Sequence, residues 1–288
     1  MANYFCLKNN MIRDYLFPIE ETYIHIEEEL LENLVVMERV GAHIALVTLN
    51  RPDACNAING PLACELERAA TEIERDPSIW VAILMGAGPR AFCAGADLKA
   101  VAAGRVAELS TPNGGFAGFT RLRRRKVWLA AVHASVLAGG LEIMLACDFA
   151  IAAEGSSFGL PEVRRGLVAT EGGLYKLGRI LPRSLALRMI ATGAPIDAQQ
   201  ALLHGLVTEI VPADALRHAA IALATTICEN SPAAVGESLS IARDSPWQDD
   251  DMLDRRCRET LARLANTADF IEGATAFAEH RAPRWQGL

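Results

Sequence analysis

The sequence predicts an α/β protein whose last third is helical. From Leu34 onward, short apolar runs alternate with segments that repeat apolar residues at helical spacing. The apolar runs end at turns that contain Gly or Pro, which is typical of strands in βαβ units. Beyond about Glu171 the strand-like runs fade, whereas the helical spacing continues. Together these observations favour buried strands covered by helices.

The same patterns assign the elements in chain order. Four apolar runs are predicted as strands, at residues 44–50, 80–85, 128–132 and 149–152. Residues 61–74 have the apolar period of a helix. Farther along, Pro182, Pro195 and Pro212 are stop signals. Helices are predicted there at residues 172–181, 183–191, 198–204, 213–230, 231–243 and 250–267.

The longest apolar run covers residues 127–141, directly after a basic stretch. It is fifteen residues long and contains His133, whereas a membrane span needs about 20 apolar residues. We therefore expect a buried core strand leading into a turn, and no membrane partner.

Three regions are expected along the chain. Residues 1–33 have no clear period and form an N-terminal extension, either a strand running into a short helix or a flexible tail. Residues 34–212 carry the α/β core, and residues 213–288 form a helical C-terminal region.

Charge and composition narrow the class of protein. The chain has 288 residues, 51% of them hydrophobic, and a formal net charge of −7. A negative long-range field repels phosphate, so we expect no nucleic-acid partner. The one basic run comprises Arg121, Arg123, Arg124, Arg125 and Lys126. In an acidic chain this run is interpreted as a solvated helix end or a salt-bridged subunit face.

Cysteine and histidine usage favours a reducing compartment and no metal. The seven cysteines are spread singly and include no Cys-x-x-Cys pair. This pattern fits a cytoplasmic protein without disulfides better than a secreted one. The six histidines have no metal-ligand spacing with Cys or Glu, so no metal is expected. The stretch Gly-Ala-Gly at residues 86–88 lacks the third glycine of the dinucleotide fingerprint, and there is no P-loop sequence.

Two glutamates stand out because each lies beside backbone suited to holding a reactive carbonyl. Glu142 ends the stretch LAGGLE at residues 137–142, and Glu162 ends SFGLPE at residues 157–162. Upstream, AFCAGADLK at residues 91–99 forms a further turn of small residues. Paired carboxylates near exposed N–H groups indicate acid/base chemistry beside a stabilised oxyanion.

These three segments together resemble the crotonase (enoyl-CoA hydratase/isomerase) superfamily. LNRP at residues 49–52, followed by Asn56-Ala57, is similar to the opening signature of that family. GGFAGF at residues 114–119 and EGATAFAE at residues 272–279 look like carnitinyl-CoA dehydratases and nearby short-chain hydratases. The resemblance covers residues 34–288. It implies a spiral of ββα units followed by C-terminal helices that build a homotrimer or a hexamer.

The resemblance also implies a set of site residues. The backbone N–H groups of Ala96 and Gly139 match the oxyanion-hole positions of the family, and Glu142 and Glu162 match the pair that holds and activates water. The turn around Ala96 implies substrate contacts, from Ala94, Asp97, Leu98 and Lys99. CoA enters as part of the substrate, so no permanently bound cofactor is expected.

The chain departs from the family at the second turn. The family commonly has Asn-Gly-x-Ala-x-Gly-Gly-Gly-x-Glu there, whereas this chain has His133, Ala134 and Ala138 in place of the Asn, the first Gly and the first of the three adjacent glycines. The Ala138 methyl group therefore changes the shape of the pocket beside the donor. The glycine-rich stretch at residues 114–119 is interpreted as a flexible loop over the acyl pocket, with Phe116 or Phe119 as an apolar wall.

The resemblance favours an enoyl-CoA hydratase that adds water reversibly to a trans-2-enoyl-CoA. One alternative is a Δ3,Δ2-enoyl-CoA isomerase, because Glu171 lies in a Thr-Glu-Gly-Gly stretch similar to that of peroxisomal isomerases. The favoured interpretation of Glu171 is a helix-dipole partner in a helix capped by Thr170. A second alternative is a crotonase-fold binding protein without catalysis, which the net charge of −7 disfavours for RNA.

Overall fold

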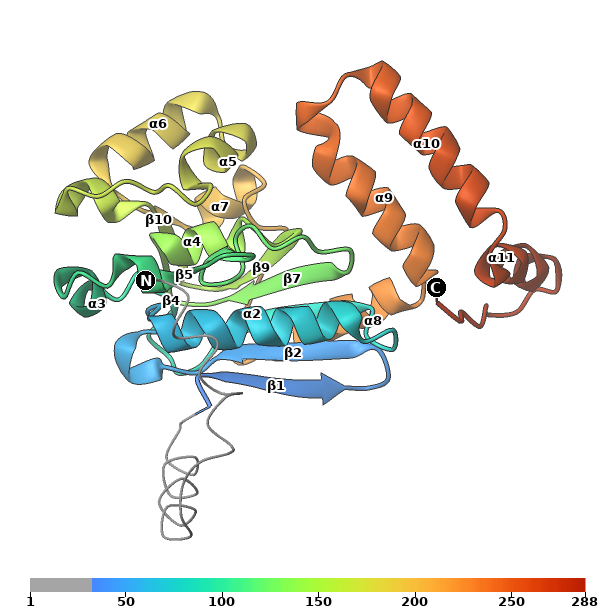
Figure 1. Cartoon of the computed structure of the whole chain (residues 1–288), viewed down its shortest axis with the longest axis horizontal. Helices are drawn as coiled ribbons and strands as arrows, with labels where there is room; N and C mark the ends of the chain where they lie inside the picture. The colour runs from blue at the N-terminus through green and yellow to red at the C-terminus, as the bar shows by residue number, and fades with distance from the viewer. Residues whose placement is uncertain (1–32, 288) are drawn as a thin grey trace, which may run out of the picture.

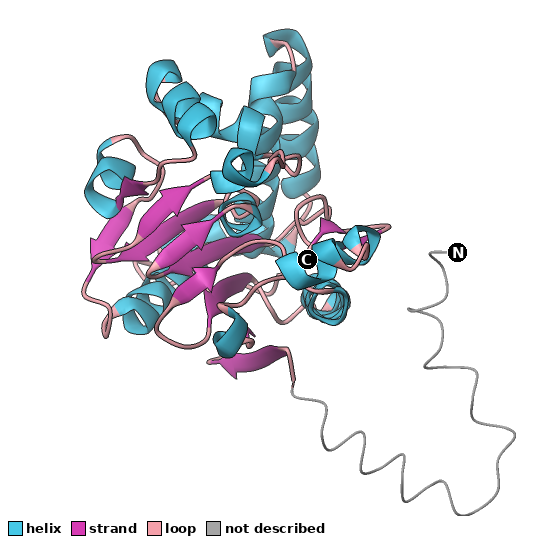
Figure 2. Ribbon diagram, turned by 90° about the vertical axis from the view of Figure 1, so that its left-hand side faces the viewer, coloured by secondary structure: helices cyan, strands magenta, loops and turns pink. Residues whose placement is uncertain are grey.

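The structure, a computed structural model, describes residues 33–287. The expected N-terminal extension therefore lies outside the described residues, apart from Asn33. Within them, the main sheet has six strands in the order β1-β2-β3-β7-β9-β12 (Figure 2). They are β1 (Val35–Val40), β2 (Ile44–Leu49), β3 (Val81–Gly86), β7 (Val127–Val132), β9 (Phe149–Ala153) and β12 (Glu209–Val211). This confirms all four predicted strands and adds the two outermost ones.

Most of the main sheet is parallel, and only the pair β1–β2 is antiparallel. All six residues of β7 are buried. Strands buried on both faces read as continuous apolar runs rather than as alternating patterns. This explains why residues 127–132 resembled a membrane segment in composition.

A second, smaller sheet has the order β11-β10-β8-β4. Its strands are β4 (Ala91–Cys93), β8 (Ser135–Leu137), β10 (Ser157–Gly159) and β11 (Ile196–Asp197). The first three are parallel to one another, and β11 is antiparallel to β10. A short hairpin is formed by β5 (Ser110–Thr111) and β6 (Gly115–Phe116).

The chain repeats one unit that feeds both sheets. In each repeat a long strand joins the main sheet, the next short strand joins the small sheet, and a short helix follows: β3-β4-α3, β7-β8-α4 and β9-β10-η4. The short helices are α3 (Leu98–Ala102), α4 (Gly139–Met144) and the 3-10 helix η4 (Pro161–Arg165). This arrangement is the spiral of ββα units that the family resemblance implied.

Longer helices cover the sheets and form the end of the chain (Figure 1). Helix α2 (Gly60–Arg75) begins at Asn59, whose side chain accepts from the Leu62 N–H, and it buries Leu62, Leu66 and Ile73. The later helices are α5 (Gly173–Ile180), α6 (Arg183–Thr192), α7 (Ala198–Leu203), α8 (Leu216–Cys228), α9 (Pro232–Asp244), α10 (Asp250–Leu264) and α11 (Ala268–Ala278). All six predicted helices of this region are present, and α11 is an additional one.

Helix α8 belongs to the core rather than to the C-terminal region in which it was predicted. Leu216, Ala220 and Ala224 are buried in one apolar cluster with strands β2, β3, β7 and β9. The helical region that stands apart from the sheets therefore starts at α9, not at residue 213. Figure 1 shows α9, α10 and α11 as an arm at one end of the molecule.

The basic run at residues 121–126 is only partly a solvated face, because Arg121, Arg123 and Arg125 are exposed but Arg124 and Lys126 are not. The Arg124 guanidinium lies 4.0 Å from the centre of the Phe119 ring and donates to the Phe119 and Ala146 carbonyls. The Lys126 ammonium donates to the carbonyls of Ile73 and Asp76 at the end of α2. Long basic side chains with apolar stems can be buried in this way while their donors are satisfied. Two of the five basic residues are thus structural.

Candidate active site

The topology of the small sheet brings the predicted site residues together. Ala96 follows β4, Gly139 and Glu142 follow β8, and Glu162 follows β10. Because β10, β8 and β4 are adjacent and parallel, their carboxyl ends meet at one edge of the sheet. That edge is where open parallel sheets place ligands. The fold thus places four residues drawn from 67 positions of the sequence at one edge of the small sheet.

The two expected oxyanion donors lie in turns that touch each other. A Cβ atom built on Gly95 would lie 2.9 Å from the Gly139 nitrogen and 2.7 Å from the Ala138 Cβ, so only glycine fits there. Within residues 33–287 neither the Ala96 N–H nor the Gly139 N–H has a hydrogen-bond acceptor. Gly139 is also the first residue of α4, where N–H groups are free and the helix dipole favours negative charge.

Charged and amide side chains fix the turn that carries Ala96. Asp97 accepts from the Lys99 N–H as the N-cap of α3, and it also pairs with Arg51 at 3.2 Å. The fully buried Asn56 donates to the carbonyls of Ala87 and Ala91 and accepts from the Arg51 N–H. The Asp97 carboxylate is thus engaged by the protein, so its role is to hold the turn. Leu98 and Lys99 are exposed beside it and remain available to a substrate.

Ala138 adopts a backbone conformation that favours glycine. Its φ is +54° and its ψ is −131°. Ala134 likewise has a positive φ, of +50°. The family pattern has glycine at both positions, so this chain keeps the positive φ that glycine adopts easily but has alanine there. A non-glycine residue in such a region costs on the order of 1–3 kcal/mol and persists when its surroundings hold it in place.

Glu142 is buried and hydrogen-bonded as a carboxylate. Its side chain is 3% exposed, and Oε1 accepts from the N–H groups of Glu171 at 2.7 Å and Gly173 at 2.9 Å. The pKa of Glu142 is raised, because the effect of burial exceeds the lowering by the Gly173 and Glu171 N–H groups. The two backbone donors stabilise the ionised form, which is the form that a general base needs.

Glu162 has the opposite environment. Its Oε2 is buried and has no hydrogen-bond partner among the described residues. Burial, together with repulsion from Glu142, raises the pKa of Glu162 to about 7. The Glu162 backbone N–H lowers this pKa, but the effect of burial is larger, and a buried carboxyl oxygen without a donor favours the protonated form. The site therefore pairs a carboxylate that is supported as an anion with one that is supported as an acid.

Glu171 does not start a helix, contrary to the prediction. Helix α5 begins at Gly173 with Gly172 before it, and Thr170 makes no cap. The Glu171 carboxylate instead accepts from Arg121 at 3.0 Å and from the Thr120 hydroxyl at 3.2 Å. Its backbone N–H serves Glu142, as described above. The side chain is therefore an ion-pair partner whose main chain supports the site.

The glycine-rich stretch is packed rather than flexible. Residues 114–120 are buried, and they form β6 and the turns after it. The Phe116 ring lies against Gly139, because a Cβ built there would be 2.4 Å from Phe116 Cε1. Phe119 points elsewhere and packs edge-to-face on Trp128 at 4.9 Å. Phe116 is thus the aromatic wall of the site, and Phe119 is a core residue.

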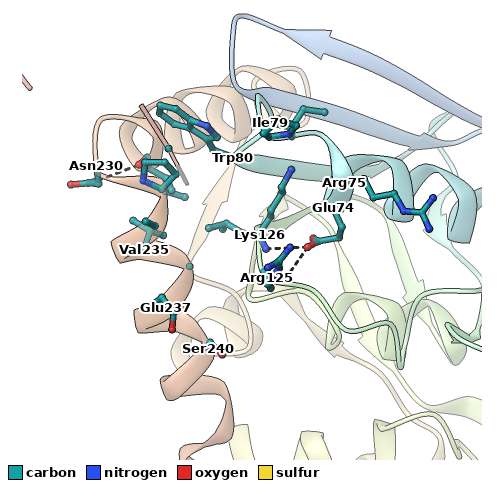
Figure 3. A pocket seen from close by; sticks show the side chains of 17 residues that line it. Glu74, Arg75, Ile79, Trp80, Arg125, Lys126, Asn230, Val235, Glu237 and Ser240 are labelled. Carbon is teal, nitrogen blue, oxygen red and sulfur yellow. Dashed lines mark hydrogen bonds between the residues drawn. The ribbon is translucent and has the colours of Figure 1, made fainter. Parts of the chain in front are cut away.

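A separate cavity of about 260 Å³ lies away from these residues, between the core and α9. Figure 3 shows Glu74, Trp80, Lys126 and Val235 lining it. The Glu74 carboxylate accepts from the Arg125 N–H and from the Trp128 indole N–H. These contacts lie within the core, and neither Glu142 nor Glu162 lines this cavity.

Two kinds of feature are absent from residues 33–287. No helix there is long and apolar enough to cross a bilayer. No group of three or more His, Cys, Asp or Glu side chains within that part of the chain could hold a metal ion.

Comparisons with known proteins agree with this geometry. The sequence profile of the enoyl-CoA hydratase/isomerase family matches residues 39–288. A mevalonyl-coenzyme A hydratase of Aspergillus fumigatus is 37% identical over 251 residues, which are 85% of this chain and 92% of that protein. A carnitinyl-CoA dehydratase of Proteus mirabilis is 37% identical over 246 residues, which are 84% of this chain and 94% of that protein.

Solved structures give the same result. An enoyl-CoA hydratase from Mycobacterium tuberculosis is 39% identical with a TM-score of 0.85, covering 89% of this chain and all of that one. A carnitinyl-CoA hydratase from Mycobacterium avium is 42% identical with a TM-score of 0.70, covering 88% of this chain and 99% of that one. The chain therefore belongs to the enoyl-CoA hydratase/isomerase family, the crotonase superfamily.

Proposed function

We propose that the chain is an enoyl-CoA hydratase, a hydro-lyase that adds water reversibly to a trans-2-enoyl-CoA thioester. The observation that carries this proposal is the contrast between the two carboxyl groups. Glu142 Oε1 accepts two backbone N–H groups, whereas the buried Glu162 Oε2 has no partner within residues 33–287. Two carboxyl groups whose environments separate their protonation states can act as a base and an acid in one reaction.

The residues perform the reaction in a defined order. The thioester oxygen accepts from the N–H groups of Ala96 and Gly139. Glu142 takes a proton from water as the water oxygen bonds to Cβ, and negative charge moves onto the thioester oxygen. Glu162 then delivers its proton to Cα, which completes the 3-hydroxyacyl-CoA product. Each oxyanion donor typically contributes roughly 3–4 kcal/mol, and each acid or base roughly 10²–10⁴-fold in rate.

The substrate is a CoA thioester with a short acyl group, and no permanently bound cofactor takes part. The names of the relatives, mevalonyl-coenzyme A hydratase and carnitinyl-CoA dehydratase, support branched or substituted short acyl groups. The exposed Leu98 and Lys99, beside the Ala96 turn, are suited to contact the CoA portion. Phe116 limits the space above Gly139, which favours a short chain.

The isomerase alternative needs a carboxyl group that moves a proton between Cα and Cγ. Glu171 is the candidate, but both of its oxygens accept from Arg121 and Thr120. An ion-paired carboxylate is a weak proton shuttle. The alternative of a binding protein without catalysis gains no support from a site that has both carboxylates and free donors.

We propose that the protein assembles as a homotrimer or a hexamer through α9–α11. The apolar residues 221–227 do not support assembly, because α8 is packed on the main sheet. Other side chains support assembly instead: Ile271 is 65% exposed and Phe277 is 84% exposed on α11. Large exposed apolar side chains that gather on one element mark an interface. A cytoplasmic location fits Cys55, Cys93, Cys147, Cys228 and Cys257, which form no disulfide among the described residues.

A panel of enoyl-CoA substrates tests the function. Hydration of crotonyl-CoA, crotonobetainyl-CoA and longer enoyl-CoAs is followed by loss of the conjugated thioester absorbance. A 3-enoyl-CoA in the same panel measures isomerisation. We expect hydration of a short substrate to be the fastest reaction. Isomerisation that exceeds every hydration rate would assign the chain to the alternative class.

A further inference from the structure

Helix α4 carries both an oxyanion donor and the proposed general base. Its first residue, Gly139, supplies an oxyanion donor, and Glu142 lies in its first turn. The helix ends at Met144, and the next two carbonyls belong to Leu145 and Ala146. A helix this short has little stability of its own, so its position depends on what holds its ends. The C-terminal end is therefore as important to the site as the end that faces the substrate.

Arg124 holds this end from the side of the core. Its Nη2 donates to the Ala146 carbonyl at 2.5 Å, and its Nη1 donates to the Phe119 carbonyl at 2.6 Å. The guanidinium also stacks on the Phe119 ring, and Arg243 of α9 donates to the Arg124 carbonyl at 3.0 Å. A planar guanidinium that is fixed on so many sides keeps a rigid distance between the carbonyls it joins.

Lys176 holds the same end from the side of α5. Its Nζ donates to the Leu145 carbonyl at 3.3 Å. Three residues earlier in the chain, the Gly173 N–H donates to Glu142. Helix α5 therefore contacts α4 twice, once at the catalytic carboxylate and once at the C-terminal carbonyl. The Lys176 stem packs over Gly172, where a Cβ would lie 3.2 Å from the Lys176 Cδ and Cε.

We propose that Arg124 and Lys176 are positioning residues, which hold the C-terminal carbonyls of α4 and thereby fix the Gly139 N–H and the Glu142 carboxylate for hydration. This inference rests on the proposed roles of Gly139 and Glu142. Two cations at a helix C-terminus are favourable because the dipole is negative there. Neither side chain touches the substrate, so neither is a catalytic residue.

The cations also influence the ionisation of Glu142. The charged groups that face Glu142 are Lys176, Glu171 with its partner Arg121, and Glu162. The Lys176 ammonium lowers the pKa of Glu142, and the Glu171 carboxylate raises it. Burial and the nearby Arg124 lower the pKa of Lys176 itself, whereas the Glu142 carboxylate raises it. Removing the charge of Lys176 should raise the pKa of Glu142.

The test compares Lys176→Met with Lys176→Arg in the full-length enzyme. Methionine keeps the stem but loses the charge and the donor, whereas arginine keeps both. In Lys176→Met we expect kcat for crotonyl-CoA hydration to fall by about tenfold or more, because small displacements at a site are costly. KM should change little. The acidic limb of the pH profile of kcat should move to higher pH, because the pKa of Glu142 rises when the Lys176 charge is lost. Lys176→Arg should restore both quantities.

Two further variants complete the design. Arg124→Lys keeps the charge but cannot reach both carbonyls, so kcat should fall while the acidic limb stays in place. Arg188→Met is the matched control, because Arg188 is an exposed cation on the neighbouring α6 and makes no side-chain contact within residues 33–287. It should behave as the wild type does.

The outcomes separate this inference from the proposed function. If Glu142→Gln abolishes hydration but Lys176→Met stays within about twofold of wild-type kcat with an unchanged acidic limb, the positioning role is wrong. If Glu142→Gln stays active, the proposed chemistry is wrong. Should Lys176→Met fail to fold, Lys176→Gln keeps a donor for Leu145 without the charge. A wild-type acidic limb in that variant would likewise overturn the inference.

Discussion

Replacing Ala138 by glycine should stabilise the protein, although glycine usually weakens a fold. The alanine backbone is held at φ +54° and ψ −131°, and relief of that strain is worth on the order of 1–3 kcal/mol. The added freedom of glycine in the unfolded chain offsets about 0.5–1 kcal/mol. The half-buried methyl group, which packs towards Gly95, accounts for at most about 0.8 kcal/mol more. The balance is a gain of about 1 kcal/mol.

Urea unfolding at a fixed protein concentration measures this gain, because assembly makes stability depend on concentration. Ala222→Gly is the matched control: Ala222 is exposed within α8 at ordinary helical geometry. That change should cost about 0.5–1 kcal/mol. The two substitutions are chemically identical, so opposite signs isolate the backbone conformation. If Ala138→Gly destabilises the protein as much as Ala222→Gly does, the strain at Ala138 is not real.

Three other outcomes are expected. Burial raises the pKa of Glu162 from 4.5 to about 7, so the stability that its protonated form contributes below pH 4.5 is lost as the pH rises through about 7. Glu162→Gln should therefore raise the free energy of unfolding above pH 7 by about 1–2 kcal/mol, a value reduced for solvent screening. The same gain in stability at pH 4.5 would contradict this explanation. Glu171→Gln should lower the free energy of unfolding by about 0.2–1 kcal/mol and leave hydration rates near wild type. The acidic limb of the pH profile of kcat should move to lower pH, because the Glu171 carboxylate raises the pKa of Glu142. Loss of a fast 3-enoyl-CoA isomerisation would instead identify Glu171 as a proton shuttle. Light scattering should show a trimer or a hexamer that Ile271→Asp with Phe277→Asp dissociates, and a wild-type monomer at micromolar concentration would refute the assembly.

Local sequence patterns predicted most of the elements because those elements obey local rules. The strand at residues 127–132 is continuously apolar because both of its faces are covered. Asp97 also follows a local rule, because a short acceptor before a helix serves the free N–H groups of that helix. The small sheet was not predicted, since strands of three residues carry too little pattern to detect.

The misplaced features depend on long-range contacts that the sequence does not encode locally. Arg124 was predicted on a solvated face because it lies in a run of five basic residues, yet its partners are Phe119 and Ala146. Glu171 was assigned to a helix start, whereas Arg121, fifty residues away, holds it. The positions of Glu142 and Glu162 came from the family resemblance. Their different environments came only from the fold, because Glu142 accepts from the Glu171 and Gly173 N–H groups, whereas the buried Oε2 of Glu162 has no partner among the described residues.

Hydration by Glu142→Gln and Glu162→Gln tests the central claim most directly. Glutamine keeps the shape of each side chain but neither takes nor delivers a proton, so crotonyl-CoA hydration should fall by roughly 10²–10⁴-fold in each variant. Circular dichroism and the oligomeric state should match the wild type. Near wild-type turnover in either folded variant would contradict a mechanism in which Glu142 is the base and Glu162 is the acid.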